Sequence, residues 1–342
     1  MTRPSLLSRR LPSRRLLLSA ALALVALAGQ TAQTAQTAFA APAAPAAAWP
    51  TKPIKIVVGF PGGSTPDMAA RVLADVLGKA YGQAVIVENR PGASGNIAAE
   101  LVSKAVDDHT LGVVINGNLT SAKLLNPKLG FDPAKDFSLL SLLATAPLVL
   151  VGPASEPGGA DWFKAARAAG NKWNYGSVGI GSVGHLGMEL VKSRAGFEAQ
   201  HVPYNGNPAV VTALISGQLQ GALVPPGVAL PQVRAGKIKA IGLTGGRSTL
   251  APELAPLSDL GIQVNELEVW VALVGPAGLS KAAQDRLARD VPTLLREAEP
   301  RQRLFVSGWQ LQGSSPEALR LRVKSEAAIL GGIISSRGIK AE

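Results

Sequence analysis

The 342-residue chain contains no cysteine and carries a formal net charge of +11. Without cysteine the chain can form no disulfide scaffold, no thiolate metal site, no catalytic thiol and no lipid-anchored N-terminal cysteine. Its lysines and arginines form no block with interleaved aromatic residues, so a nucleic-acid partner is not expected.

The first 40 residues have the pattern of a signal peptide. A basic segment precedes the apolar run Leu16–Ala28, which is too short to span a bilayer comfortably, and Ala38–Ala40 fits a small-x-small cleavage site. Residues 41–48 form an Ala/Pro tether. The leader holds five arginines and no acid, so its removal leaves a net charge of +6. We therefore expect cleavage near Ala40 and a soluble, monomeric protein in the periplasm. Because Ser13–Leu18 is close to a twin-arginine signal, both that route and the general secretory route remain open.

The remaining residues, about 290, are enough for two domains, and strand patterns alternate with helix patterns along them. The expected strands are Ile54–Gly59, Ala84–Glu88, Thr110–Ile115, Trp173–Gly176, His201–Tyr204, Leu219–Val224, Lys239–Thr244 and Trp270–Val274, with a longer apolar stretch over Leu139–Val151. The expected helices are Pro66–Ala80, Ile97–Ala105, Ala160–Ala169, Val183–Ser193, Pro208–Ser216, Lys281–Ala298 and Pro316–Leu330. Such alternation predicts an α/β fold with parallel sheets that are covered on both faces.

Two glycine-rich segments, Phe60–Asp67 and Tyr175–Ser182, each connect an expected strand to an expected helix. In the first, Thr65 is the expected N-cap and Pro66 the first helical residue. Such a junction leaves backbone N–H groups unpaired at the positive end of a helix dipole, so each segment is a candidate anion site. The alternative is that each segment is only a tight turn between strand and helix.

The second segment continues into Gly179–Gly184, which has the literal pattern G-x-G-x-x-G. A dinucleotide site would also need an acidic residue about twenty positions further on, at the end of the next strand. Glu198 instead precedes the expected strand His201–Tyr204, so an anion site with Ser182 as the N-cap requires fewer assumptions. His185 follows one turn later, where contact with the ligand and a structural role are both open.

Two further loops lie on the expected ligand-facing edge, at Tyr204–Pro208, with Asn207 as N-cap, and at Asn116–Asn118. No Ser/His/Asp set, carboxylate pair or metal-like histidine spacing is present in the sequence, so we expect neither an enzyme nor a cofactor. The candidate ligand-binding residues are Phe60, Gly63, Ser64, Thr65, Asp67, Asn116, Asn118, Ser177, Gly179, Gly181, Ser182, His185, Tyr204 and Gly206.

A series of motifs in order along the chain resembles one known family. The motifs are Trp49–Ile54, the first glycine-rich loop, Val87–Ala93, Gly95–Ile97, Asn126–Pro127, Asp132–Phe137, Ser177–Leu186, His201–Tyr204, Trp270 and Gly275–Gly278. Over Trp49 to Lys340 the chain resembles the periplasmic solute receptors of tripartite tricarboxylate transporters, also called Bug-type receptors. The resemblance implies a two-domain type II periplasmic-binding-protein fold with a cleft between the domains, in which residues 49–149 and 270–342 form domain 1 and residues 150–269 form domain 2.

The resemblance also implies a function. Such receptors bind a small organic acid, largely through backbone N–H groups, hydroxyls and waters, close around it and pass it to membrane transporter subunits. Departures from the family pattern at Ser64, Asn205, Gln220 and Asp107–Thr110 bear on which acid is bound. An exported NAD(P)-dependent oxidoreductase that uses Gly179–Gly184 is the alternative, and a ligand sensor would use the same pocket.

Overall fold

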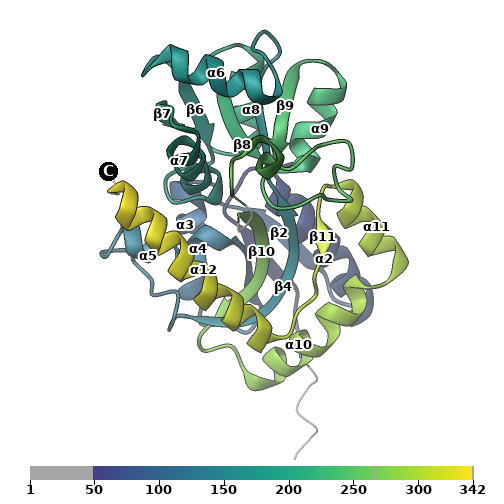
Figure 1. Ribbon diagram of the computed structural model, residues 1–342. Helices are drawn as coiled ribbons and strands as arrows, with labels where there is room; N and C mark the ends of the chain where they lie inside the picture. Colours follow the sequence, from purple (N-terminus) through teal and green to yellow (C-terminus); the bar gives the residue numbers. More distant parts are fainter. Residues whose placement is uncertain (1–48, 265–266, 341–342) are drawn as a thin grey trace, which may run out of the picture. The chain divides into compact units, whose positions relative to one another are not determined.

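The computed structural model describes residues 49–264 and 267–340, so the predicted signal peptide and tether lie outside the described part (Figure 1). The elements in chain order are β1 (Ile54–Val58), α2 (Thr65–Tyr81), β2 (Val85–Asn89), η1 (Ala93–Gly95), α3 (Asn96–Ser103), β3 (Thr110–Ile115), α4 (Asn116–Leu119), α5 (Ala122–Leu125), β4 (Phe137–Pro147), β5 (Val149–Pro153), α6 (Gly159–Ala169), β6 (Asn174–Ser177), α7 (Val183–Ala195), β7 (Gln200–Pro203), α8 (Asn207–Ile215), β8 (Gly221–Val224), α9 (Pro226–Arg234), β9 (Ile238–Leu243), η2 (Leu257–Leu260), β10 (Glu268–Pro276), α10 (Lys281–Leu295), α11 (Ala298–Val306), β11 (Gln310–Leu311) and α12 (Pro316–Arg337).

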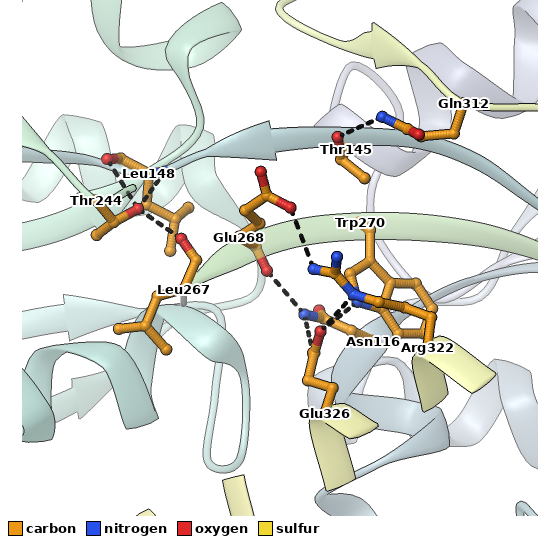
Figure 2. Close-up of polar contacts among 10 residues, drawn as sticks. All are labelled: Asn116, Thr145, Leu148, Thr244, Leu267, Glu268, Trp270, Gln312, Arg322 and Glu326. Carbon is orange, nitrogen blue, oxygen red and sulfur yellow. Dashed lines mark hydrogen bonds and ion pairs between the residues drawn. The ribbon is translucent and has the colours of Figure 1, made fainter. Parts of the chain in front are cut away.

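The strands form two sheets, with the orders β11-β4-β10-β3-β1-β2 and β7-β6-β8-β5-β9. The chain passes from the first sheet to the second across Leu148 alone, between β4 and β5, and returns between β9 and β10. Thr244 joins these two connections, because its Oγ1 accepts from the N–H of Leu148 at 2.8 Å and donates to the carbonyl of Leu267 at 2.7 Å (Figure 2). These two connections are therefore held side by side.

Each sheet contains both parallel and antiparallel strand pairs, although the alternating pattern predicts parallel pairing. The predicted parallel pairs are present around β1, with β2 and β3, and around β6, with β7 and β8. The strands next to the connections are antiparallel: β10 pairs with β3 and β4, and β5 pairs with β8 and β9. The strands β5 and β10 each follow a connection from the other sheet. No helical crossover within one sheet precedes them, and a parallel pair would require such a crossover.

Helices cover both faces of each sheet. On the first sheet, α2 and α10 pack on one face, and α3 and the start of α12 pack on the other. On the second sheet, α6 and α7 cover one face and α8 and α9 the other. The long helix α12 serves both sheets (Figure 1), because Leu319 packs in the core of the first while Leu330 and Ile333 pack in the core of the second.

Four local predictions are wrong. The expected loop at Asn116–Asn118 is instead part of the short helix α4. The N-cap of α2 is Ser64, so Thr65 is the first helical residue; similarly, Gly206 caps α8 and Asn207 is its first residue. Proline is the second residue of both helices. The N–H at that position has no acceptor within the helix, so its absence costs no intrahelical hydrogen bond. The single helix expected over Lys281–Ala298 ends at Leu295, and α11 starts separately at Ala298.

Candidate functional site

A small cavity of about 30 Å³ lies where helix starts from both sheets meet. Its walls follow the carboxyl ends of β1, β3, β6 and β8, which is the edge where open α/β sheets bind ligands. The lining residues are Phe60, Ser64, Thr65, Pro66, Ile115, Asn116, Leu148, Val178, Ser182, Val183, Gly184, Asn207, Leu223, Pro225, Val269 and Trp309. The first residues of α2, α7 and α8 and the N-cap of α9 are among them, so four helix N-termini border one small space.

The start of α2 brings two hydroxyl groups to this cavity. Ser64 and Thr65 are each 1% exposed, and within the described residues neither Ser64 Oγ nor Thr65 Oγ1 has a hydrogen-bond partner. Trp309 fixes the backbone beside them, because its Nε1 donates to the carbonyl of Thr65 at 3.0 Å. A buried hydroxyl without a partner costs free energy, so these two groups indicate a place for a polar ligand.

Asp67 and Gly63, both candidate ligand residues, instead hold this loop in shape. The N–H of Gly63 donates to Asp67 Oδ2 at 2.8 Å, and Arg71 and Asn89 donate to the same carboxylate. Burial opposes ionisation of Asp67, but these three donors outweigh it and lower its pKa. Neither residue lines the cavity, and Arg71 forms a structural salt bridge with Asp67 at 2.9 Å.

Asn116, the first residue of α4, contributes a third polar atom. Its side chain is fully buried, and its Oδ1 has no hydrogen-bond partner among the described residues. Its Nδ2 donates to Glu326 Oε1 at 2.7 Å and to the Glu268 carbonyl at 3.1 Å (Figure 2). The candidate Asn118 has a structural role instead: it accepts from the N–H of Ile115 and donates to the Ser94 carbonyl.

Behind Asn116, Glu326 is a buried carboxylate with a set of donors (Figure 2). Its Oε2 accepts from Trp270 Nε1 at 2.6 Å and from Arg322 Nε at 3.2 Å, and Arg322 also binds Glu268. Burial raises the pKa of Glu326, although the Trp270, Arg322 and Asn116 donors act in the opposite direction. This network ties the cavity wall to α12 and β10.

The start of α7 forms the opposite wall. Ser182 is its N-cap, as predicted: its Oγ accepts from the N–H of His185 at 3.3 Å and donates to the Gly179 carbonyl at 2.7 Å. Because this hydroxyl is already used, the wall offers a ligand mainly the backbone of Val183 and Gly184. The N–H groups at these first helical positions have no acceptor within the helix.

Ser177 and His185 lie behind this loop rather than in the cavity. His185 Nδ1 accepts from the N–H of Gly181 at 3.2 Å, and Ser177 Oγ lies 2.7 Å from His201 Nε2. The two imidazole rings stack with centroids 4.1 Å apart. Burial lowers the pKa of His185 to about 4, and burial together with the neighbouring His185 lowers that of His201 to about 3. Both rings are therefore neutral at pH 7 and shape the loop.

Other candidates border neighbouring spaces. Gly179 and Tyr204 line a second, more open cavity of about 360 Å³, and Gly181 and Asn118 line a small one of about 10 Å³. Gly206 lies at the N-cap of α8, and a Cβ there would contact Pro61. Five candidates line the cavity of about 30 Å³ itself, namely Phe60, Ser64, Thr65, Asn116 and Ser182.

Several lining residues were not among the candidates from the sequence. Pro225 could have been found, because Leu219–Val224 followed by Pro225 and Pro226 repeats the strand–proline–helix pattern of the first loop. Trp309 lies between the end of α11 and the start of β11, and no local pattern connects it to the cavity.

The cavity has mostly apolar walls with a few polar groups, and it is uncharged. No lysine, arginine, aspartate or glutamate lines it in the described part of the chain. Residues 49–264 and 267–340 also contain no cluster of metal-ligating side chains, and no helix there is long and apolar enough to cross a membrane. Helix dipoles, hydroxyls and backbone N–H groups can hold an anion in such a space.

Two mixed sheets covered by helices, with a cavity between helix starts that holds a few buried polar groups, define a two-domain solute-binding protein of the periplasmic type. The chain belongs to the tripartite tricarboxylate transporter receptor family, TctC, whose family model matches residues 69–336. The family resemblance of the sequence is thus confirmed. Members of this family and the structural neighbours are solute-binding receptors and not enzymes, and membership implies a periplasmic location.

Similar proteins include one relative and two solved structures. A "UPF0065 protein in tcbD-tcbE intergenic region" of Pseudomonas sp. (strain P51) is 31% identical over 82% of this chain and 84% of its own length. The structure of R. palustris Rpa4515 with adipate is 30% identical, with a TM-score of 0.81 over 85% of this chain and 99% of that one. The structure of MatC of Rhodopseudomonas palustris, with bound malate, is 27% identical, with a TM-score of 0.77 over 84% of this chain and 100% of that one.

Proposed function

We propose that the protein captures a small organic acid in the cavity of about 30 Å³ and delivers it to the membrane subunits of a tripartite tricarboxylate-type transporter. The observation that carries this proposal is the group of three buried polar atoms, Ser64 Oγ, Thr65 Oγ1 and Asn116 Oδ1, that line one cavity and have no partner among the described residues. Each unmade hydrogen bond costs about 1–3 kcal/mol, which a polar ligand would offset.

The lining chemistry favours an acid over other polar ligands. Four helix N-termini supply positive dipole ends and backbone N–H groups, and Ser64 and Thr65 supply hydroxyls that can donate to a carboxylate. The solved neighbours with adipate and malate support this class. The literal G-x-G-x-x-G of Gly179–Gly184 gains no support as a nucleotide site, since the family consists of receptors.

Capture requires the cavity to open. A space of about 30 Å³ holds roughly two water molecules, because each needs about 10–15 Å³ of this kind of volume. An acid such as malate is larger, so the two sheets would separate to admit it and close around it. We place the moving domains at residues 49–149 with 270–342 and at residues 150–269. Sheet membership supports this division except at Val149, Glu268 and Val269, which each belong to the sheet of the other domain. Residues 1–40 would direct export and be removed near Ala40.

The test is a thermal-shift screen of the purified protein with succinate, adipate, malate, NAD and NADP. A ligand that binds only the folded state raises the melting temperature. We expect at least one acid to raise it and both nucleotides to leave it unchanged. Thr65→Val should reduce the shift, whereas Thr293→Val, an exposed control on α10, should not. A shift with a nucleotide and none with any acid would contradict the proposal.

A further inference from the structure

Asn116 presents the cavity with a different kind of group from Ser64 and Thr65. A hydroxyl can donate or accept a hydrogen bond, so Ser64 and Thr65 can adapt to either kind of ligand atom. An amide oxygen can only accept. Asn116 Oδ1 is buried and without a partner in the described part of the chain, and Asn116 lines the cavity.

The orientation of this amide is fixed by its neighbours rather than free to reverse. The two groups that receive hydrogen bonds from Nδ2 are the Glu326 carboxylate and the Glu268 backbone carbonyl, both of which only accept. A reversed amide would place Oδ1 against two oxygens. Glu326 cannot adapt, because its other oxygen is occupied by the donors of Trp270 and Arg322 (Figure 2).

We propose, building on the function above, that Asn116 makes the receptor selective for acids that also carry a hydrogen-bond donor. The ligand class is then a carboxylate with a hydroxyl, amine or amide N–H near the acid group. An unsubstituted acid would leave Asn116 Oδ1 unpaired or place one of its own oxygens against it, and both outcomes cost affinity. A site built to pair with a donor rejects the analogue that lacks the donor more strongly than an apolar pocket does.

The first experiment compares matched acids in the unmodified protein. Calorimetry at one pH measures the dissociation constants of malate against succinate and of 2-hydroxybutyrate against butyrate. Within each pair the acids differ by one hydroxyl, so we expect the hydroxylated acid to bind at least tenfold more tightly. Equal affinities, or tighter binding of succinate and butyrate, would overturn the selectivity. If acids bind without this preference, the proposed function stands; if none binds, the proposed function itself fails.

The second experiment reverses the amide through Glu326→Gln. The introduced side chain keeps its oxygen toward the two donors of Trp270 and Arg322, so its amide nitrogen faces Asn116. Asn116 then turns to accept from this N–H, gives up its Nδ2 hydrogen bond to the Glu268 carbonyl and directs Nδ2 into the cavity. We expect the preference within each pair to disappear or to favour the unsubstituted acid. Loss of stability alone would not change this ratio.

Glu317→Gln is the matched control, because Glu317 lies exposed on the first turn of the same helix. It should keep the preference of the unmodified protein. A Glu326→Gln protein that folds and keeps the full preference would contradict the proposed role of the Asn116 amide. If Glu326→Gln does not fold, the matched acids in the unmodified protein still decide.

Discussion

Ser64 and Ser182 are both helix N-caps on opposite walls of the cavity, yet their hydroxyls differ in what they bind. Ser182 Oγ makes the capping bond to the N–H of His185, whereas Ser64 Oγ makes no bond within the described residues. Ser182→Ala should therefore lower the free energy of unfolding by about 1 kcal/mol. Ser64→Ala should not lower it and should raise it, because the change removes a buried hydroxyl without a partner, while acid binding should weaken by about 0.5–1.5 kcal/mol.

Urea unfolding measures the first quantity and calorimetry the second. Each variant is the control for the other, because both exchange a buried hydroxyl for hydrogen at a helix start. Equal losses of stability in the two proteins would show that the Ser64 hydroxyl has a protein partner after all.

Gly179 is a residue where the backbone needs glycine. Its φ is +122°, and a Cβ there would lie 2.0 Å from Ser94 Oγ. Gly179→Ala should therefore destabilise the protein by about 1–3 kcal/mol through backbone strain and displace the loop that starts α7. Thermal unfolding and acid affinity should both fall. Gly278→Ala, in open space, is the control, and adding Ser94→Ala should restore part of the loss by removing the closest atom.

At the scale of elements, α7 and β7 share a pair of neutral histidines, and this pair predicts an acid-sensitive loop. Folded-state pKa values of about 4 for His185 and about 3 for His201 lie below the ordinary value of 6.5. The unfolded chain thus binds more protons between pH 6.5 and about 4. The contribution of the two neutral histidines to the free energy of unfolding is present in full above pH 6.5 and is lost as the pH falls toward about 4.

Denaturation at pH 7.5, 6, 5 and 4.5 gives the free energy of unfolding that tests this slope. Glu189 and Lys192 face the same pair and act on it in opposite directions, so burial dominates. The His201→Asn variant should show a shallower dependence on pH. A free energy that stays constant from pH 7.5 to 4.5 would contradict neutral, buried rings.

An element can be predicted from the sequence when the residues that cause it are neighbours in the chain. The apolar run of β3 is buried at all of its positions and was predicted to the residue, because a central strand needs only its own side chains to be recognised. The N-caps at Ser64 and Gly206 were missed by one residue, since proline is compatible with either of the first two helical positions.

The site was predictable only where a motif lies at the end of a strand. Ser64, Thr65, Asn116 and Ser182 satisfy that condition, and all line the cavity. Trp309 lies in the loop between α11 and β11 and binds Thr65, and Glu326 lies on α12 and binds Asn116. Each of these contacts joins residues more than 200 positions apart, so it depends on packing of the whole chain. Nothing in the sequence near them indicates these contacts.

At the scale of the whole molecule, Thr244 links both connections between the sheets. Thr244→Val removes its hydroxyl and leaves the buried N–H of Leu148 without this acceptor, which should cost about 1–3 kcal/mol of stability. Because the connections then move more independently, the protein should also open more readily. Stopped-flow fluorescence should show faster ligand release, with Thr212→Val on the exposed face of α8 as the control. An unchanged release rate would mean that Thr244 only stabilises the fold.

The cavity has a further consequence because its lining, as far as the structure describes it, contains no ionised side chain. Mobile ions weaken attraction between exposed charges beyond the Debye length, which is roughly 10 Å at 0.1 M and 3 Å at 1 M. Buried dipoles and N–H groups escape this weakening. The dissociation constant for an acid should therefore vary little with sodium chloride concentration, which titrations at several salt levels can measure. Such a receptor would keep its affinity for the solute when the ionic strength around it rises.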